Sequence, residues 1–203
     1  MNAKPDHSAR TAPLSNDCQV LWKSPAPASI SAGKAMLNIL PDGRLVAGMM
    51  VAPKGREHYG FREDHWGLWR GWLFTSDDRG RSWDRRAEHP VPNGRLILNG
   101  EDLYLVGGRD GMLVMRSRDR GETWEGPWRI VEGGNWYNEP TNHLFANGRV
   151  YLAINRITKE VRPADRGVYA PVVFSAKVGD DWSDPAAWTR SNTYTWYDLV
   201  AEC

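Results

Sequence analysis

From about residue 30 onward, short apolar runs alternate with turn signals, and no segment shows a sustained helical period. Asp-Gly or Asn-Gly pairs stand between apolar runs at 42–43, 99–100 and 147–148, where a tight hairpin requires positive φ. A further apolar run follows each hairpin after a longer gap. The pattern predicts three units of four strands, A to D, with a tight A–B turn and a longer B–C loop. The expected A, B and C strands lie at 35–40, 44–50 and 72–75; at 95–98, 101–106 and 112–116; and at 141–146, 149–155 and 171–174.

An eight-residue motif, Ser-x-Asp-x-Gly-x-Ser/Thr-Trp, follows the third strand of each unit. Two copies are complete, and Lys177 stands at the Asp position of a degraded third copy. The motif residues are Ser76, Asp78, Gly80 and Trp83; Ser117, Asp119, Gly121 and Trp124; and Ser175, Gly179 and Trp182. We expect the glycines to allow an unusual φ and the aspartates to accept hydrogen bonds within the turn. We also expect Trp83 and Trp124 to be buried between sheets.

A four-stranded unit repeated every 40–50 residues or so is typical of a β-propeller blade, so the sequence predicts an all-β propeller. The expected boundaries are a leader at 1–29 and a partial propeller at 30–203, with blades at about 30–90, 91–135 and 136–190. In an up-and-down meander, the A–B and C–D turns lie on one face of the disc. The opposite face then carries the longer connections, expected at 51–71, 130–140 and 156–168, and such loops commonly hold the functional site.

The repeated motif resembles the Asp-box, or bacterial neuraminidase repeat, of the sialidase superfamily. The resemblance covers residues from about 30 to 190 and implies a six-bladed propeller, of which this chain contains about three blades. It also implies that the Asp-box aspartates are structural. Because half a disc would leave the apolar flanks of its end blades bare, we expect self-association through these open edges and no turnover by this chain alone.

Sialidases carry an Arg at the start of strand A in their first blade, and the counterpart of that position here is Lys34. Lysine cannot form the two-pronged contact that arginine makes with a carboxylate. The resemblance places the catalytic acid/base at Asp64, in the long loop before the first Asp-box. A solvated carboxylate paired with a neighbouring side chain is the alternative for Asp64. The remaining arginines and the tyrosine nucleophile of the family belong to later blades.

Other candidate substrate-binding residues lie in the same long loop and before strand A of the third unit. They are Arg56, Arg62, Trp136, Tyr137, Asn138 and Glu139. The basic side chains suit an anionic sugar, although they could equally solvate a long loop. Aromatic rings beside amide and carboxylate groups suit a sugar, which stacks on rings and hydrogen-bonds through hydroxyls. Packing between blades is the alternative for Trp136.

Composition narrows the functional classes. The 203 residues include 11 Trp but only two Cys, and the net charge is +1, so bulk charge does not indicate binding to nucleic acid or anionic membranes. No apolar run is long enough for a membrane span, and the polar first 17 residues predict no secretory leader, although sialidases are often secreted or periplasmic. No metal or cofactor is expected. The sequence favours a sialidase-like exo-glycosidase acting on a terminal sugar, with a non-catalytic glycan- or protein-binding propeller as the alternative.

Overall fold

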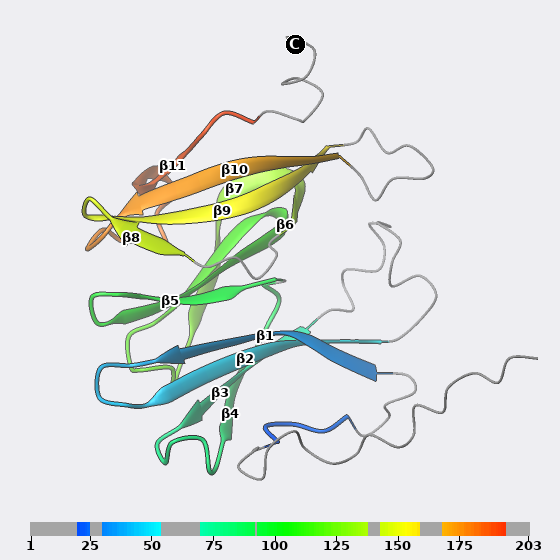
Figure 1. Cartoon of the computed structure of the whole chain (residues 1–203), viewed down its shortest axis with the longest axis vertical. Coiled ribbons are helices and arrows are strands. Elements are labelled where there is room, and N and C mark those ends of the chain that lie inside the picture. Colours follow the sequence, from blue (N-terminus) through cyan, green and yellow to red (C-terminus); the bar gives the residue numbers. More distant parts are fainter. Residues whose placement is uncertain are drawn as a thin grey trace, which may run out of the picture.

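The computed structural model describes residues 20–24, 30–53, 70–91, 93–137, 143–158 and 168–193. These residues are all-β apart from one short 3-10 turn, η4 (Pro185–Ala187). The chain builds three four-stranded antiparallel sheets, as the sequence predicts for propeller blades. Figure 1 shows the sheets following one another along the chain, from the N-terminal strands at the bottom to the C-terminal strands at the top.

The first blade contains β1 (Ile30–Ile39), β2 (Leu45–Pro53), β3 (Arg70–Ser76) and β4 (Asp84–His89), paired in sequence order. β1 is irregular between Gly33 and Met36, where its pairing with β2 shifts register. The expected strands A to C of the first unit are therefore confirmed, although β2 extends to residue 53.

The second blade contains β5 (Arg95–Asn99), β6 (Asp102–Ser117) and β7 (Glu125–Tyr137). β6 supplies two strands of the meander, because its residues 102–106 pair with β5 and its residues 110–116 pair with β7. The chain reverses sharply between them, since a Cβ atom on Gly108 would lie 2.5 Å from the carbonyl oxygen of Gly111. The expected B–C connection at 107–111 is thus a tight hairpin in this blade.

The third blade contains β8 (Leu144–Ala146), β9 (Arg149–Thr158), β10 (Val168–Lys177) and β11 (Trp188–Arg190). β7 continues into this blade, since its residues 135–137 pair with residues 155–157 of β9. The expectation that 130–140 forms a loop is therefore wrong for residues 130–137, which stay in strand pairing with β6 and then β9. Gly133 and Gly134, both at positive φ, lie where the strand passes from one blade to the next.

Two apolar clusters hold the blades together. Alternation along each strand sends one set of side chains between the first and second blades, where Val46 and Leu73 pack with Leu103 and Leu105. Between the second and third blades, the cluster includes Tyr104, Trp136, Phe174 and Trp182. At roughly 25 cal/mol per Å² of apolar surface, such burial is the main force joining neighbouring blades.

The outer surfaces of the two end blades expose apolar side chains. Val46 faces the second blade, and its partner in β1, Asn38, lies on the same face of the sheet. Leu37 and Ile39, on either side of Asn38, therefore face away and are 60% and 63% exposed. On the third blade, Val173 is 42% exposed. Part of the first flank is covered, because the Trp22 ring packs edge-on against Trp72 at 5.2 Å. Self-association through these flanks stays a prediction.

Candidate functional site

The first Asp-box is a turn closed by its own side chains. One carboxylate oxygen of Asp78 accepts hydrogen bonds from the Ser76 hydroxyl and the Ser82 backbone N–H, both at 2.8 Å, while the other accepts from the Ser82 hydroxyl at 2.6 Å. The Ser76 hydroxyl in turn accepts the Gly80 N–H at 2.8 Å. The Trp83 indole N–H donates to the Gly80 carbonyl at 3.0 Å. Gly80 has a φ of +83°, which glycine adopts without strain.

The second Asp-box repeats these bonds. Asp119 accepts from the Ser117 hydroxyl at 2.8 Å and from the Thr123 N–H at 2.9 Å. Hydrogen bonds from Ser82 and Ser76 lower the pKa of Asp78 to about 2. Partial burial works in the opposite direction at Asp119, yet bonds from Thr123 and Ser117 still lower the pKa of that carboxyl. Both aspartates are therefore ionised acceptors committed to their own turns.

The third motif copy has different hydrogen-bond partners from the first two. The Ser175 hydroxyl accepts from the Arg149 guanidinium at 2.7 Å, and the Gly179 N–H donates to the Asn99 side chain of the second blade at 2.8 Å. Asp181, four residues after the position where Lys177 replaces the Asp, accepts the Ser183 N–H at 2.9 Å instead.

The tryptophans of the three motif copies differ in burial. Trp182 is fully buried, whereas Trp83 and Trp124 are only half-buried. The expected burial of Trp83 and Trp124 between sheets is met only in part, because each indole N–H bonds the glycine of its own turn. Trp124 also packs against the apolar cluster between the first and second blades.

Ion pairs and hydrogen bonds connect the second and third motif copies to the A–B turn of the preceding blade. The buried Arg44 guanidinium contacts Glu122 in the second box and lies 3.4 Å from Asp77 in the first. Asn99 reaches the third motif copy, donating to the Asp180 carbonyl at 2.9 Å. These contacts place the boxes and the A–B turns on one face, which we call the box face. The A–B turns gather at the left of Figure 1. The meander parity predicted from the sequence is confirmed for these turns.

The opposite ends of the strands define the loop face. Several predicted site residues lie outside the described residues: Arg56, Arg62, Asp64, Asn138 and Glu139. Lys34 lies in the irregular part of β1 with a φ of +54°. Tyr137 belongs to β7, and its backbone pairs with Asn155 at the loop-face end of β9. Whether these residues share one cleft stays a prediction.

Trp136 is only 1% exposed, which favours the packing alternative over direct contact with a ligand. Its indole N–H donates to the Gly133 carbonyl at 2.9 Å, and its ring packs edge-on against Phe174 at 5.2 Å. The Arg156 guanidinium lies over this ring, 5.8 Å from its centre. Arg156 is half-buried and forms no ion pair within the described part of the chain. Trp136 thus supports a cation at the loop face.

The sequence reading missed the hairpin at 107–111, which also lies on the loop face. Asp110 pairs in register with Asn135, the residue before Trp136. The signal was present, because Asp110-Gly111 is the same kind of hairpin pair as Asp42-Gly43. Asp-Gly and Asn-Gly pairs therefore predict hairpins in the B–C connections as well as in the A–B turns.

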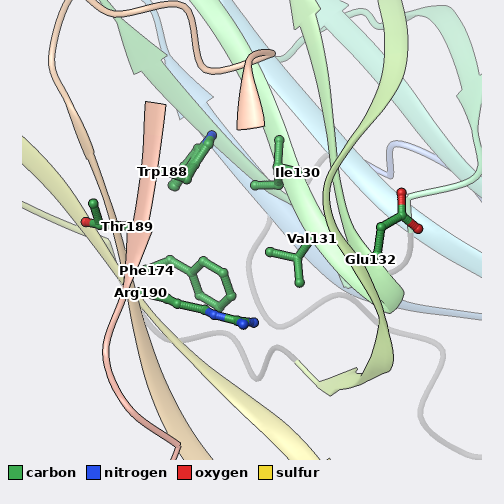
Figure 2. A pocket seen from close by; sticks show the side chains of 7 residues that line it. All are labelled: Ile130, Val131, Glu132, Phe174, Trp188, Thr189 and Arg190. Atoms are coloured by element: carbon green, nitrogen blue, oxygen red, sulfur yellow. The ribbon is translucent and has the colours of Figure 1, made fainter. Parts of the chain in front are cut away.

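A pocket of about 350 Å³ opens between the second and third blades (Figure 2). In this view, the Arg190 side chain extends below the Phe174 ring, and Trp188 and Ile130 lie above that ring. Its lining residues are Ile130, Val131, Glu132, Phe174, Trp188, Thr189 and Arg190. Phe174 and Trp188 are 1% and 9% exposed, so they offer little ring surface for a sugar to stack on.

Among the described residues, no three His, Cys, Asp or Glu side chains are grouped closely enough to hold a metal ion. The same part of the chain contains no helix of the length and apolarity needed to span a membrane.

The fold is similar to that of an α-L-arabinofuranosidase from Lactobacillus brevis, with a TM-score of 0.57 and 16% identity over 85% of this chain. A protein of unknown function from Dyadobacter fermentans aligns over 81% of this chain with a TM-score of 0.53 and 16% identity. This chain spans only 59% and 55% of those two proteins. No family model and no curated protein matches the sequence. The likeness supports a β-propeller fold.

Proposed function

We propose that the chain forms part of a sialidase-like exo-glycosidase and that its loop face binds a terminal sugar bearing a carboxylate. The observation that carries this proposal is Arg156, a half-buried guanidinium held over Trp136 without an acidic partner among the described residues. A buried or half-buried cation normally finds an anion, and Arg44 on the box face has two. A carboxylate ligand would give Arg156 the acidic partner that the described residues do not supply.

The chemistry of arginine suits this role. Its planar guanidinium offers parallel N–H groups to a carboxylate, and stacking on an indole ring limits its motion before the ligand arrives. The interaction would fix one side of the sugar at the loop-face end of β9. Lys34 would add a second positive charge from the first blade, as the family resemblance implies.

Asp64 completes the proposal as the general acid/base. Glycoside hydrolysis needs a group that protonates the leaving oxygen, and the resemblance assigns that role to Asp64. The arabinofuranosidase named above supports a glycosidase reading only through its fold. A non-catalytic glycan-binding propeller remains the second candidate, favoured by the Lys at position 34 where sialidases have Arg.

Saturation-transfer NMR on the full chain tests the proposal. The probes are the methyl α-glycoside of N-acetylneuraminic acid, which carries a carboxylate, and methyl α-L-arabinofuranoside, which does not. We expect the acidic probe to bind and Arg156→Gln to weaken its binding by about tenfold, the usual effect of losing a hydrogen bond to a charged group. The matched control is Arg81→Gln, an exposed arginine in the first Asp-box turn, which should leave binding unchanged.

Failure of the acidic probe to bind, or equal binding by Arg156→Gln and wild type, would overturn the proposal. Turnover separates the two candidate functions. Release of 4-methylumbelliferone from its sialoside, abolished in Asp64→Asn, would exclude the non-catalytic propeller. It would also contradict the expectation that three blades cannot act alone.

A further inference from the structure

An aromatic ring and an imidazole lie together between the second and third blades. β1, β5 and β8 are the A strands of the three blades, each pairs with a single neighbour in its sheet, and Figure 1 shows β5 between β1 and β8. The Asn38 side chain of β1 donates to the Leu96 carbonyl of β5 at 3.3 Å, which joins two of these strands. Because a propeller arranges its sheets around a central channel, we assign the row of A strands to the channel side and call it the inner edge. Phe145 of β8 is 45% exposed there, and His143, just before β8, is half-buried.

Both side chains face the second blade. Phe145 pairs in register with Val150, a member of the cluster between the second and third blades, and residues in register share a face of the sheet. His143, two residues earlier, lies on the same face, and its ring packs edge-on against the Phe145 ring with the ring centres 5.3 Å apart. Arg95 of β5 faces this pair from the second blade, because it alternates onto the same face as Ile97 of that cluster.

The His143 imidazole is neutral near neutral pH and has hydrogen-bonding groups that the described part of the chain does not use. Burial, and then the positive charge of Arg95, lower the pKa of His143. One nitrogen of a neutral imidazole donates a hydrogen bond and the other accepts one. Neither nitrogen of His143 has a hydrogen-bond partner among the described residues, whereas Nδ1 of the buried His89 accepts the Val91 N–H.

The second blade shows that the fold does not require these two residue types. Counted back from the last paired residue before each A–B turn, the counterparts of His143 and Phe145 are Leu96 and Leu98. Leu96 is only 4% exposed, and Leu98 packs against the cluster between the first and second blades. Leucine therefore serves at these positions where packing is the only requirement, and the third blade has an imidazole and an exposed ring in the same places.

We infer that His143 and Phe145 form a second sugar-binding site, which takes a pyranoside at the inner edge between the second and third blades. The exposed part of the Phe145 ring can stack on the C–H face of a sugar ring, while the two His143 nitrogens bond neighbouring hydroxyls. Arg156 lies six residues beyond Val150 along β9, which is roughly 20 Å in an extended strand. The site is therefore separate from the contact that Arg156 provides, and it does not depend on the proposed function.

Titration of the full chain with methyl β-D-galactopyranoside, followed by ¹H–¹⁵N NMR, tests this inference. His143→Leu and Phe145→Leu introduce the residue type that the second blade has at the same position, so both variants should fold, which circular dichroism checks. We expect each to weaken galactoside binding by about fivefold, through loss of a hydrogen bond or of the aromatic contact. The matched control is Leu144→Ala, because Leu144 is exposed and pairs with Tyr151 on the opposite face, and this variant should bind as wild type does.

The wild-type titration also locates the site without any variant. Saturable shifts are expected for the amide signals of residues 143–146 and 95–97. Absence of galactoside binding, shifts confined to other strands, or unchanged affinity in both leucine variants would each overturn the inference. Arg156→Gln should leave galactoside affinity unchanged, and loss of binding in that variant would mean that one site takes both sugars. The acidic glycoside tests the proposed function on its own, so either result can fail without the other.

Discussion

The box face and the loop face use their charged groups differently. On the box face, the Asp78 and Asp119 carboxylates are saturated by their own turns, and the buried Arg44 contacts carboxylates of two Asp-boxes. On the loop face, Arg156 and Asp110 have no ion-pair partner among the described residues. Among the described residues, the same sheets thus carry a network of ion pairs at one end and charged groups outside any ion pair at the other.

This difference separates charged groups that stabilise the fold from charged groups that the fold does not use. A buried charge without a partner is destabilising, so a fold retains arginines such as Arg44 and Arg116 by pairing them. Arg116 contacts Asp181 of the third blade at 3.0 Å and Glu125 at 3.2 Å, which ties two blades together. Among the described residues, Arg156 and Asp110 take no part in such a network.

The largest expected effect concerns the tryptophans of the box face. Trp182 is fully buried between the second and third blades, so Trp182→Ala should reduce the free energy of unfolding by about 3–5 kcal/mol. Trp83 is half-buried over its own turn, so Trp83→Ala should cost only about 1–2 kcal/mol. Urea unfolding followed by circular dichroism measures both values. Equal losses would mean that the half-buried rings support the blades as strongly as the buried one.

A buried histidine at the loop-face end of β4 should make stability depend on pH. His89 is 1% exposed and packs against Gly71, where a Cβ atom would lie 1.9 Å from the imidazole ring. Burial lowers the pKa of His89 to about 4, although a hydrogen bond from the Val91 N–H to Nδ1 is also present. The imidazole is therefore neutral in the folded protein near neutral pH.

The unfolded chain binds a proton at His89 more readily than the folded chain does, so acidification favours unfolding. The stability linked to His89 is fully present above the unfolded pKa of about 6.5 and is lost as the pH falls toward 4. The total loss is about 3 kcal/mol. Unfolding free energies measured from pH 7 to pH 4.5 should fall less steeply in His89→Asn. His143→Asn, which changes a half-buried histidine, should keep most of the wild-type slope. Parallel slopes for His89→Asn and wild type would contradict this assignment.

Local turn chemistry made much of the fold predictable. The pairs at 42–43, 99–100 and 147–148 form the A–B turns, and the two complete motif copies form the hydrogen bonds that their residue types suggest. Each signal depends on residues within eight positions of one another. The predicted face of the Asp-boxes followed from strand parity alone, without knowledge of any long-range contact.

Contacts between blades were the part that the sequence could not reveal. The third motif copy has a different hydrogen-bond pattern because the Gly179 N–H donates to the side chain of Asn99, 80 residues earlier in the chain. Residues 135–137 remain in a strand because β9 pairs with them, although their glycine-rich surroundings resemble a loop. The Asp110-Gly111 turn has a local signal, but its pairing with Asn135 is a register that no local pattern encodes.

The smallest expected effect compares two aspartates, one from each face. Asp119→Ala removes the acceptor for Ser117 and Thr123, so it should reduce the free energy of unfolding by about 1–2 kcal/mol, less than for a buried group because the turn is partly exposed. Asp110→Ala should change it by less than about 0.5 kcal/mol, since the exposed carboxylate has no bond to lose among the described residues. Because the pKa of Asp119 is lowered in the fold, its contribution is present above the unfolded pKa and is lost as the pH falls through the folded one. Thermal unfolding of both variants at pH 7 measures the comparison. A loss of stability in Asp110→Ala as large as that in Asp119→Ala would show that the hairpin carboxylate serves the fold and would remove the contrast between the two faces.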